Sequence, residues 1–123
     1  MSVDPAMRPR LTNGYELDKA MSSRAIGRIV QSKNRDFAEG DMVQNGIGFR
    51  EYAVSDGRGL RKITPEAGIP LTAYMSVLGN PGFTAYGGLL EIGKLQDGEQ
   101  VFVSTAAGAV GQVAVQIAKI KGR

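Results

Sequence analysis

The sequence predicts a mixed α/β fold, and three observations along its length support this. Residues 1–65 hold short apolar segments separated by turn signals, a pattern typical of strands. From about Leu71 the apolar residues recur at helical spacing. The last quarter runs from an apolar segment through a turn of small residues into an amphipathic helix. We therefore predict two parts: residues 1–79, rich in strands, and residues 80–123, which begin a dinucleotide-binding domain.

Short strands account for most of the first part. Residues 26–30 (IGRIV) alternate well enough for a strand, and residues 41–44 (DMVQ) and 49–54 (FREYAV) are further candidates. Turn signals that contain glycine separate these segments. Several short strands at this close spacing indicate a small barrel or sandwich.

A helix is predicted to begin at Asn80, with asparagine as its N-cap and Pro81 at the first helical position. Gly93 is the predicted end of this helix. Its predicted apolar face consists of Phe83, Tyr86, Gly87 and Leu90. We accordingly expect Tyr86 to lie in the core.

The closing segment predicts a strand and a helix joined by a tight turn. Val101, Phe102 and Val103 are consecutive apolar residues that favour strands, as expected for a parallel strand buried on both faces. A second helix is predicted from Val110, because apolar residues recur at i, i+3, i+4 and i+7. The residues of this face are Val110, Val113, Ala114 and Ile117.

The turn between them resembles a dinucleotide fingerprint in which alanine replaces the first glycine. Ala106, Gly108 and Gly111 have the G-x-G-x-x-G spacing. The first small residue permits a tight turn, the second lets the backbone approach a pyrophosphate, and the third allows close helix packing. The helix N-terminus would offer free N–H groups and its positive dipole end to the phosphates. Small residues before a helix also serve plain close packing, so both interpretations stay open.

The composition excludes several kinds of chemistry. The 123 residues contain no cysteine and no histidine, so thiol catalysis, a histidine base and a zinc site built from these residues are excluded. We therefore predict no metal site. Proton transfer has to fall to tyrosine, lysine, a carboxylate, water or a cofactor.

Charge and hydropathy give expectations about partners. The net charge of +3 comes from basic residues interleaved with acidic ones, which favours a solvated surface, so we expect no nucleic-acid partner. No apolar run approaches the roughly 18 residues of a membrane span. The N-terminus has no pattern typical of a signal peptide. We expect a cytoplasmic protein without a membrane partner.

Four blocks of sequence carry a family resemblance. They are residues 1–11 (MSVDPAMRPRL), 52–57 (YAVSDG), 80–93 (NPGFTAYGGLLEIG) and 99–122 (EQVFVSTAAGAVGQVAVQIAKIKG). In this order they resemble the medium-chain dehydrogenase/reductase superfamily. More narrowly, they resemble its zinc-free branch of prostaglandin reductases, leukotriene B4 12-hydroxydehydrogenases and curcumin reductases.

The resemblance implies a partial GroES-like β-barrel followed by the first strand and helix of a Rossmann domain. It implies an oxidoreductase that uses NADPH to reduce the C=C bond of α,β-unsaturated ketones or aldehydes. Negative charge would develop on the carbonyl oxygen of the substrate, so a proton donor is needed. The cofactor-binding residues implied are Ala106, Ala107, Gly108, Ala109, Val110 and Gly111.

Tyr15 is the candidate catalytic residue, since some members of the branch place a functional tyrosine shortly after the block that residues 1–11 match. A half-buried barrel tyrosine with its hydroxyl in water is the alternative interpretation. Departures from the family pattern include Ala6 where tyrosine is common, Asn80 where methionine is common, and residues 22–24 (SSR) in place of a glycine-rich stretch.

Family members extend beyond both ends of this sequence, so we expect a truncated chain. Open strand edges would then favour self-association, with a homodimer as the expected form. Enone reduction by this chain alone is expected to be absent or very slow. A non-catalytic remnant, or a dimerising barrel that binds no cofactor, is the alternative function.

Overall fold

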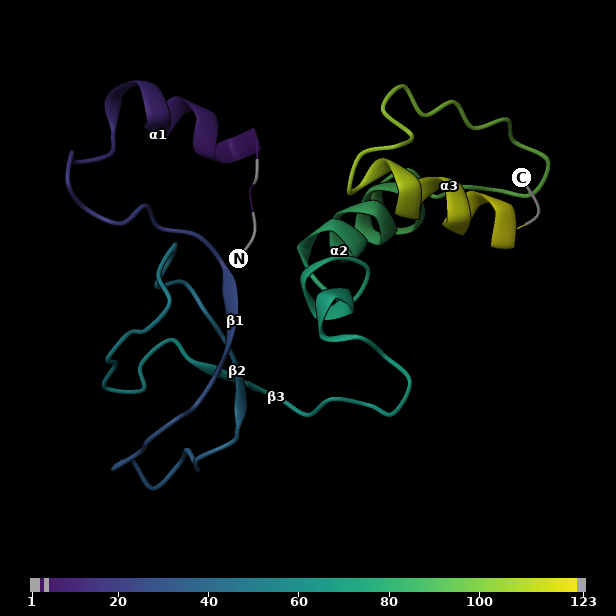
Figure 1. Ribbon diagram of the computed structural model, residues 1–123. Helices are drawn as coiled ribbons and strands as arrows, with labels where there is room; N and C mark the ends of the chain where they lie inside the picture. The colour runs from purple at the N-terminus through teal and green to yellow at the C-terminus, as the bar shows by residue number, and fades with distance from the viewer. Residues whose placement is uncertain (1–2, 4, 122–123) are drawn as a thin grey trace. The chain divides into compact units, whose positions relative to one another are not determined.

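The computed structural model describes residue 3 and residues 5–121 (Figure 1). The chain divides into two compact units, Met1–Gly68 and Ile69–Arg123, called unit 1 and unit 2 here. In unit 1, the short helices η1 (Pro5–Met7) and α1 (Arg8–Asn13) precede three strands. Unit 2 is helical in its regular parts. The domain boundary expected after residue 79 stays a prediction.

The strands of unit 1 form one antiparallel sheet in the order β1-β2-β3 (Figure 1). They are β1 (Ala25–Arg28), β2 (Met42–Asn45) and β3 (Arg61–Ile63). Ala25 lies opposite Asn45, and Met42 lies opposite both Arg28 and Ile63. The first two predicted strands are thus present, shifted by a residue or two.

The third strand is not where the sequence predicted it. Residues 49–54 form no strand, and β3 lies further along the chain. After β2 the chain continues beside the residues that precede β1, because the Phe49 N–H donates to the Met21 carbonyl oxygen at 3.0 Å, in the register that pairs Ala25 with Asn45. Gly48 makes this possible with φ of +98°, and a Cβ there would lie 2.1 Å from the same oxygen. The free side of β2 then pairs with β3.

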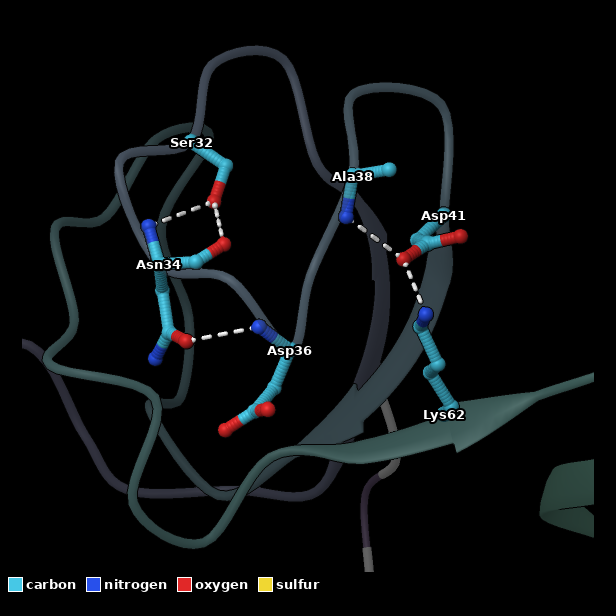
Figure 2. Close-up of polar contacts among 6 residues, drawn as sticks. All are labelled: Ser32, Asn34, Asp36, Ala38, Asp41 and Lys62. Carbon is cyan, nitrogen blue, oxygen red and sulfur yellow. Dashed lines mark hydrogen bonds and ion pairs between the residues drawn. The ribbon is translucent and has the colours of Figure 1, made fainter.

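An ion pair links the start of β2 to β3 (Figure 2). Asp41 Oδ2 accepts hydrogen bonds from Lys62 Nζ at 2.7 Å and from the Ala38 N–H at 2.8 Å. These two bonds, that from Lys62 first, lower the pKa of Asp41 below its ordinary value of 3.8. A neighbouring loop is held by its own side chains, since Asn34 Oδ1 accepts the Asp36 N–H at 2.9 Å.

Unit 2 contains η2 (Leu71–Met75), α2 (Asn80–Tyr86), η3 (Gly87–Ile92) and α3 (Gly111–Ile120). The N-cap of α2 is Gly79, one residue before the predicted Asn80, and it makes no side-chain cap bond. The π-helical η3 continues α2, and the Gly93 N–H bonds to the Gly88 carbonyl at 2.9 Å. The predicted helix end at Gly93 is confirmed.

The predicted buried face of α2 is wrong. Phe83 and Tyr86 are 77% and 50% exposed, whereas Gly82 and Ala85 are buried. Small residues face α3 because they let two helices approach closely, and Ala85 packs there with Val113 and Ala114. Gly82 also has no room for a side chain, since a Cβ would lie 1.7 Å from the Val77 carbonyl oxygen.

The strand predicted at 101–103 is absent from the described residues, which is a third correction. Val103 packs on the helical core, but Phe102 is 90% exposed. A strand exists only through hydrogen bonds to a neighbouring strand, and none lies beside this segment in unit 2. The Rossmann arrangement therefore stays a prediction.

Candidate functional site

The candidate site is the turn that leads into α3. Residues 104–110 form this turn, and Gly111 is the first residue of α3. All six candidate cofactor-binding residues therefore lie in the turn or at the start of the helix. The Gly108 N–H donates to the Thr105 carbonyl oxygen at 3.0 Å, and the Gln112 N–H donates to the Gly108 carbonyl oxygen at 3.0 Å. The backbone therefore reverses over four residues and passes directly into α3.

Gly111 meets the close-packing requirement expected of the last small residue in the motif. A Cβ at this buried position would lie 1.9 Å from the Thr105 carbonyl oxygen and 2.7 Å from its carbonyl carbon. The first residue of α3 therefore lies directly against the backbone at the start of the turn. Thr105 was not singled out from the sequence, although its position between the apolar run and the small residues was a usable signal.

Gly108 is under no comparable steric demand. A Cβ there would lie 3.2 Å from Thr105 Cγ2 and 3.3 Å from the Thr105 carbonyl oxygen. Small shifts of the neighbouring atoms would make room for it. The packing of the turn thus explains a glycine at 111 but does not require one at 108.

Backbone donors at the start of α3 are unpaired. Within the described chain, the N–H groups of Ala109, Val110 and Gly111 donate no hydrogen bond to another residue. No side chain caps the helix, and its first turn has no acidic residue to repel an anion. Unpaired N–H groups at the positive end of a helix dipole are suited to phosphate oxygens.

The body of α3 anchors this end of the helix. Val113, Ala114 and Ala118 are buried, and Ile117 packs against the same core. The predicted apolar face is confirmed except for Val110, which is 38% exposed. Because the buried face of α3 holds the helix on the core, the turn before it is held in place as well. The exposed small residues of the turn stay accessible.

Tyr15 belongs to unit 1, and the turn belongs to unit 2. The residue is half-buried after α1, where its N–H donates to the Arg10 carbonyl oxygen at 3.0 Å. Its hydroxyl donates a long hydrogen bond of 3.4 Å to the Ser22 carbonyl oxygen. So long a bond is weak and leaves the hydroxyl able to take another partner.

The described residues hold neither a candidate metal cluster nor a candidate membrane-spanning helix. Residue 3 and residues 5–121 include no group of three or more acidic, cysteine or histidine side chains that could hold a metal ion. Over the same residues, none of the helices has the length and apolar character needed to cross a membrane.

Comparison with known proteins gives consistent results. Residues 1–63 match the family described as the N-terminal domain of oxidoreductase. The chain is 45% identical to prostaglandin reductase 1 of Rattus norvegicus over 124 residues, which cover 99% of this chain and 37% of the relative. It is 37% identical to the NADPH-dependent curcumin reductase of Escherichia coli, again over 99% of this chain and 37% of the relative.

A solved structure agrees with these relatives. The crystal structure of CurA from Vibrio vulnificus in complex with NADPH superposes with a TM-score of 0.82 at 37% identity. The match covers 98% of this chain and 37% of that chain. The present chain therefore spans about 37% of the length of the proteins it resembles.

Proposed function

We propose that this chain binds the pyrophosphate of NADPH at the turn before α3. The chain belongs to the zinc-free prostaglandin reductase and curcumin reductase branch of the medium-chain dehydrogenase/reductase superfamily. The observation that carries the proposal is the row of unpaired N–H groups at Ala109, Val110 and Gly111. The names of relatives as NADPH-dependent reductases support it.

The residues of the turn fit a pyrophosphate chemically. Ala106, Ala107 and Ala109 are exposed and carry only a methyl group, so they would neither block a phosphate nor repel it. Gly108 would let the cofactor approach the backbone, and Gly111 would keep the helix N-terminus close to the turn.

The proposed reaction of the complete enzyme is reduction of the C=C bond of an α,β-unsaturated ketone or aldehyde. When bound, NADPH supplies a hydride to the β-carbon of such a substrate. Tyr15 Oη would donate a proton to the carbonyl oxygen as negative charge develops there, which gives an enol. Water would then add a proton to the α-carbon and take up the hydroxyl proton of the enol, so that the saturated ketone or aldehyde forms, and water would also return a proton to the tyrosine. The weak 3.4 Å bond to Ser22 supports this role, because little is lost when the hydroxyl changes partner.

Cofactor binding is tested on this chain directly. The fluorescence of NADPH should change in a saturable way as the protein is added to it. The Tyr15→Phe variant should bind NADPH with the same affinity as wild type, because Tyr15 is not in the turn. If the fluorescence does not respond at millimolar NADPH, nucleotide binding is refuted, and the alternative of a chain that binds no cofactor is favoured.

Turnover is tested in a chimera, because the chain spans about 37% of its relatives. The chimera would carry this chain in place of the matching segment of the Escherichia coli curcumin reductase. Tyr15→Phe should lower enone-dependent NADPH oxidation by about 10²-fold, the usual contribution of a positioned acid. Unchanged turnover would refute the role of Tyr15 without affecting the assignment of the turn.

A further inference from the structure

Asn45 and Gly46 form an asparagine–glycine step at the end of β2. In such a step the backbone nitrogen of the glycine can attack the side-chain amide carbon of the asparagine, because glycine has no side chain to hinder closure of the five-membered ring. A second step of this kind is formed by Asn13 and Gly14. The two steps contain the same residues in different surroundings, so the structure distinguishes their reactivity.

The attacking nitrogen is available at Gly46 and occupied at Gly14. Gly46 is exposed, and within the described chain its N–H donates no hydrogen bond to another residue. β2 has a strand on each side, but its pairing with β3 ends at Gln44, so neither strand uses this N–H. By contrast, Asn13 is the last residue of α1, and the Gly14 N–H donates to the Arg10 carbonyl oxygen at 2.8 Å.

The side-chain carbonyl of Asn45 is held beside the free nitrogen and activated there. Asn45 Oδ1 accepts the Ile47 N–H at 3.0 Å, which folds the side chain back over the following peptide. Negative charge develops on this oxygen when its carbon is attacked, so the Ile47 N–H stabilises the tetrahedral intermediate. Among the described residues, Asn45 Nδ2 has no hydrogen-bond acceptor that would retain it as the leaving group, and the Asn13 side chain has no donor like Ile47.

We propose that Asn45 is a site of deamidation promoted by the chain itself. Gly46 N forms a bond to Asn45 Cγ, and the Cγ–Nδ2 bond breaks. Water carries the proton of the Gly46 N–H to the leaving group, which departs as ammonia. Water then hydrolyses the resulting succinimide at either of its carbonyl carbons, which leaves aspartate or isoaspartate at position 45. Water is the only co-reactant, and nothing is oxidised or reduced.

The reaction changes the end of β2. Either product is a carboxylate in place of a neutral amide, which removes one unit of the net charge of +3. Isoaspartate also adds a carbon atom to the backbone, which displaces the residues that follow it. The hydrogen bond from the Phe49 N–H to the Met21 carbonyl oxygen could then not form in its present register. Deamidation would therefore loosen the chain where it continues beyond β2.

Peptide mass spectrometry of the full chain, kept folded at mildly alkaline pH, tests this proposal. Deamidation is detected as the mass difference between OH and NH₂. Asn45 should deamidate at least about tenfold faster than Asn13, because a free N–H and a hydrogen bond to the developing charge distinguish it. In guanidinium chloride the two rates should become similar, and Asn45 should react more slowly than in the folded chain.

Two results would overturn the proposal. One is a folded chain in which Asn45 and Asn13 deamidate equally fast or Asn13 reacts faster. The other is an Asn45 that reacts no faster in the folded chain than in the unfolded one, since the fold would then not promote the reaction.

Gly46→Ala tests the attacking residue in the folded protein. A Cβ at Gly46 would meet no atom within 4 Å, and the residue lies outside the left-handed region, so the variant should have the circular dichroism of wild type. Its methyl group hinders the nitrogen, so deamidation of Asn45 should slow several-fold. Gly87→Ala is the matched control, since its Cβ also enters open space but lies in unit 2. Equal rates in the two variants would contradict the proposal, whether or not the chain binds NADPH.

Discussion

Replacing Gly111 with alanine tests whether the start of α3 depends on a glycine. The added Cβ would lie 1.9 Å from the Thr105 carbonyl oxygen and 2.7 Å from the carbonyl carbon. Both are backbone atoms, so rotation of a side chain cannot relieve the contact. The turn or the helix has to move by more than about 1 Å before the carbon and oxygen reach van der Waals separation.

The expected cost follows from two opposing effects. Overpacking a close contact costs about 1–3 kcal/mol, while alanine in place of glycine in a helix returns at most about 1 kcal/mol. We therefore expect Gly111→Ala to lower the free energy of unfolding by about 1–2 kcal/mol. Gly108→Ala is the matched control, since its Cβ meets Thr105 atoms only at 3.2 and 3.3 Å, and a change within about 0.5 kcal/mol is expected.

Urea unfolding followed by circular dichroism measures both variants. Gly111→Ala should lower the midpoint with an unchanged slope, whereas Gly108→Ala should leave the midpoint in place. In an NADPH titration, Gly108→Ala should lower the cofactor affinity more than Gly111→Ala does, because a methyl group at 108 stands where we propose that the pyrophosphate approaches. Equal midpoints for Gly111→Ala and wild type would refute the steric argument. Unchanged NADPH affinity in Gly108→Ala would refute the role assigned to Gly108.

Two further predictions concern stability. Lys62 lowers the folded-state pKa of Asp41, so the ionised carboxylate stabilises the fold above pH 3.8, and this contribution is lost as pH falls through the lowered pKa. Asp41→Asn should accordingly have a lower urea midpoint than wild type at neutral pH, with a difference that shrinks below pH 3.8; a constant difference would contradict the assignment. Val113→Ala should cost roughly 1–3 kcal/mol by leaving a cavity beside α2. Val115→Ala, at a position 42% exposed, should cost less in the same unfolding assay, and equal losses would show that burial does not decide the cost.

The candidate turn was predictable from the sequence because its geometry is local. Small residues at 106, 108 and 111 allow a tight reversal, and the first N–H groups of any α-helix have no partner within the helix. The structure added a distinction between the glycines. Of these two glycines, only Gly111 is fixed by the packing of the chain itself, and the role of Gly108 at the pyrophosphate stays a prediction.

The environment of Tyr15 was not predictable in the same way. Its hydroxyl contacts the Ser22 carbonyl oxygen, and no periodicity in the sequence pairs these two positions. Its catalytic role rests on family resemblance and stays a prediction, as does any approach of Tyr15 to the turn.

The sequence by itself determined the elements whose cause lies within a few residues. The apolar spacing from Val113 to Ile117 defined the buried face of α3, Gly93 ended the preceding helix, and the absence of cysteine and histidine limited the chemistry. Only the tertiary structure decided that α2 buries Ala85 rather than Tyr86, because apolar residues occupy more than one side of that helix and close contact with α3 selects the small ones. It also decided where β3 forms, and that residues 101–103 form no strand with any other described residue, since strands depend on distant partners that local sequence does not specify.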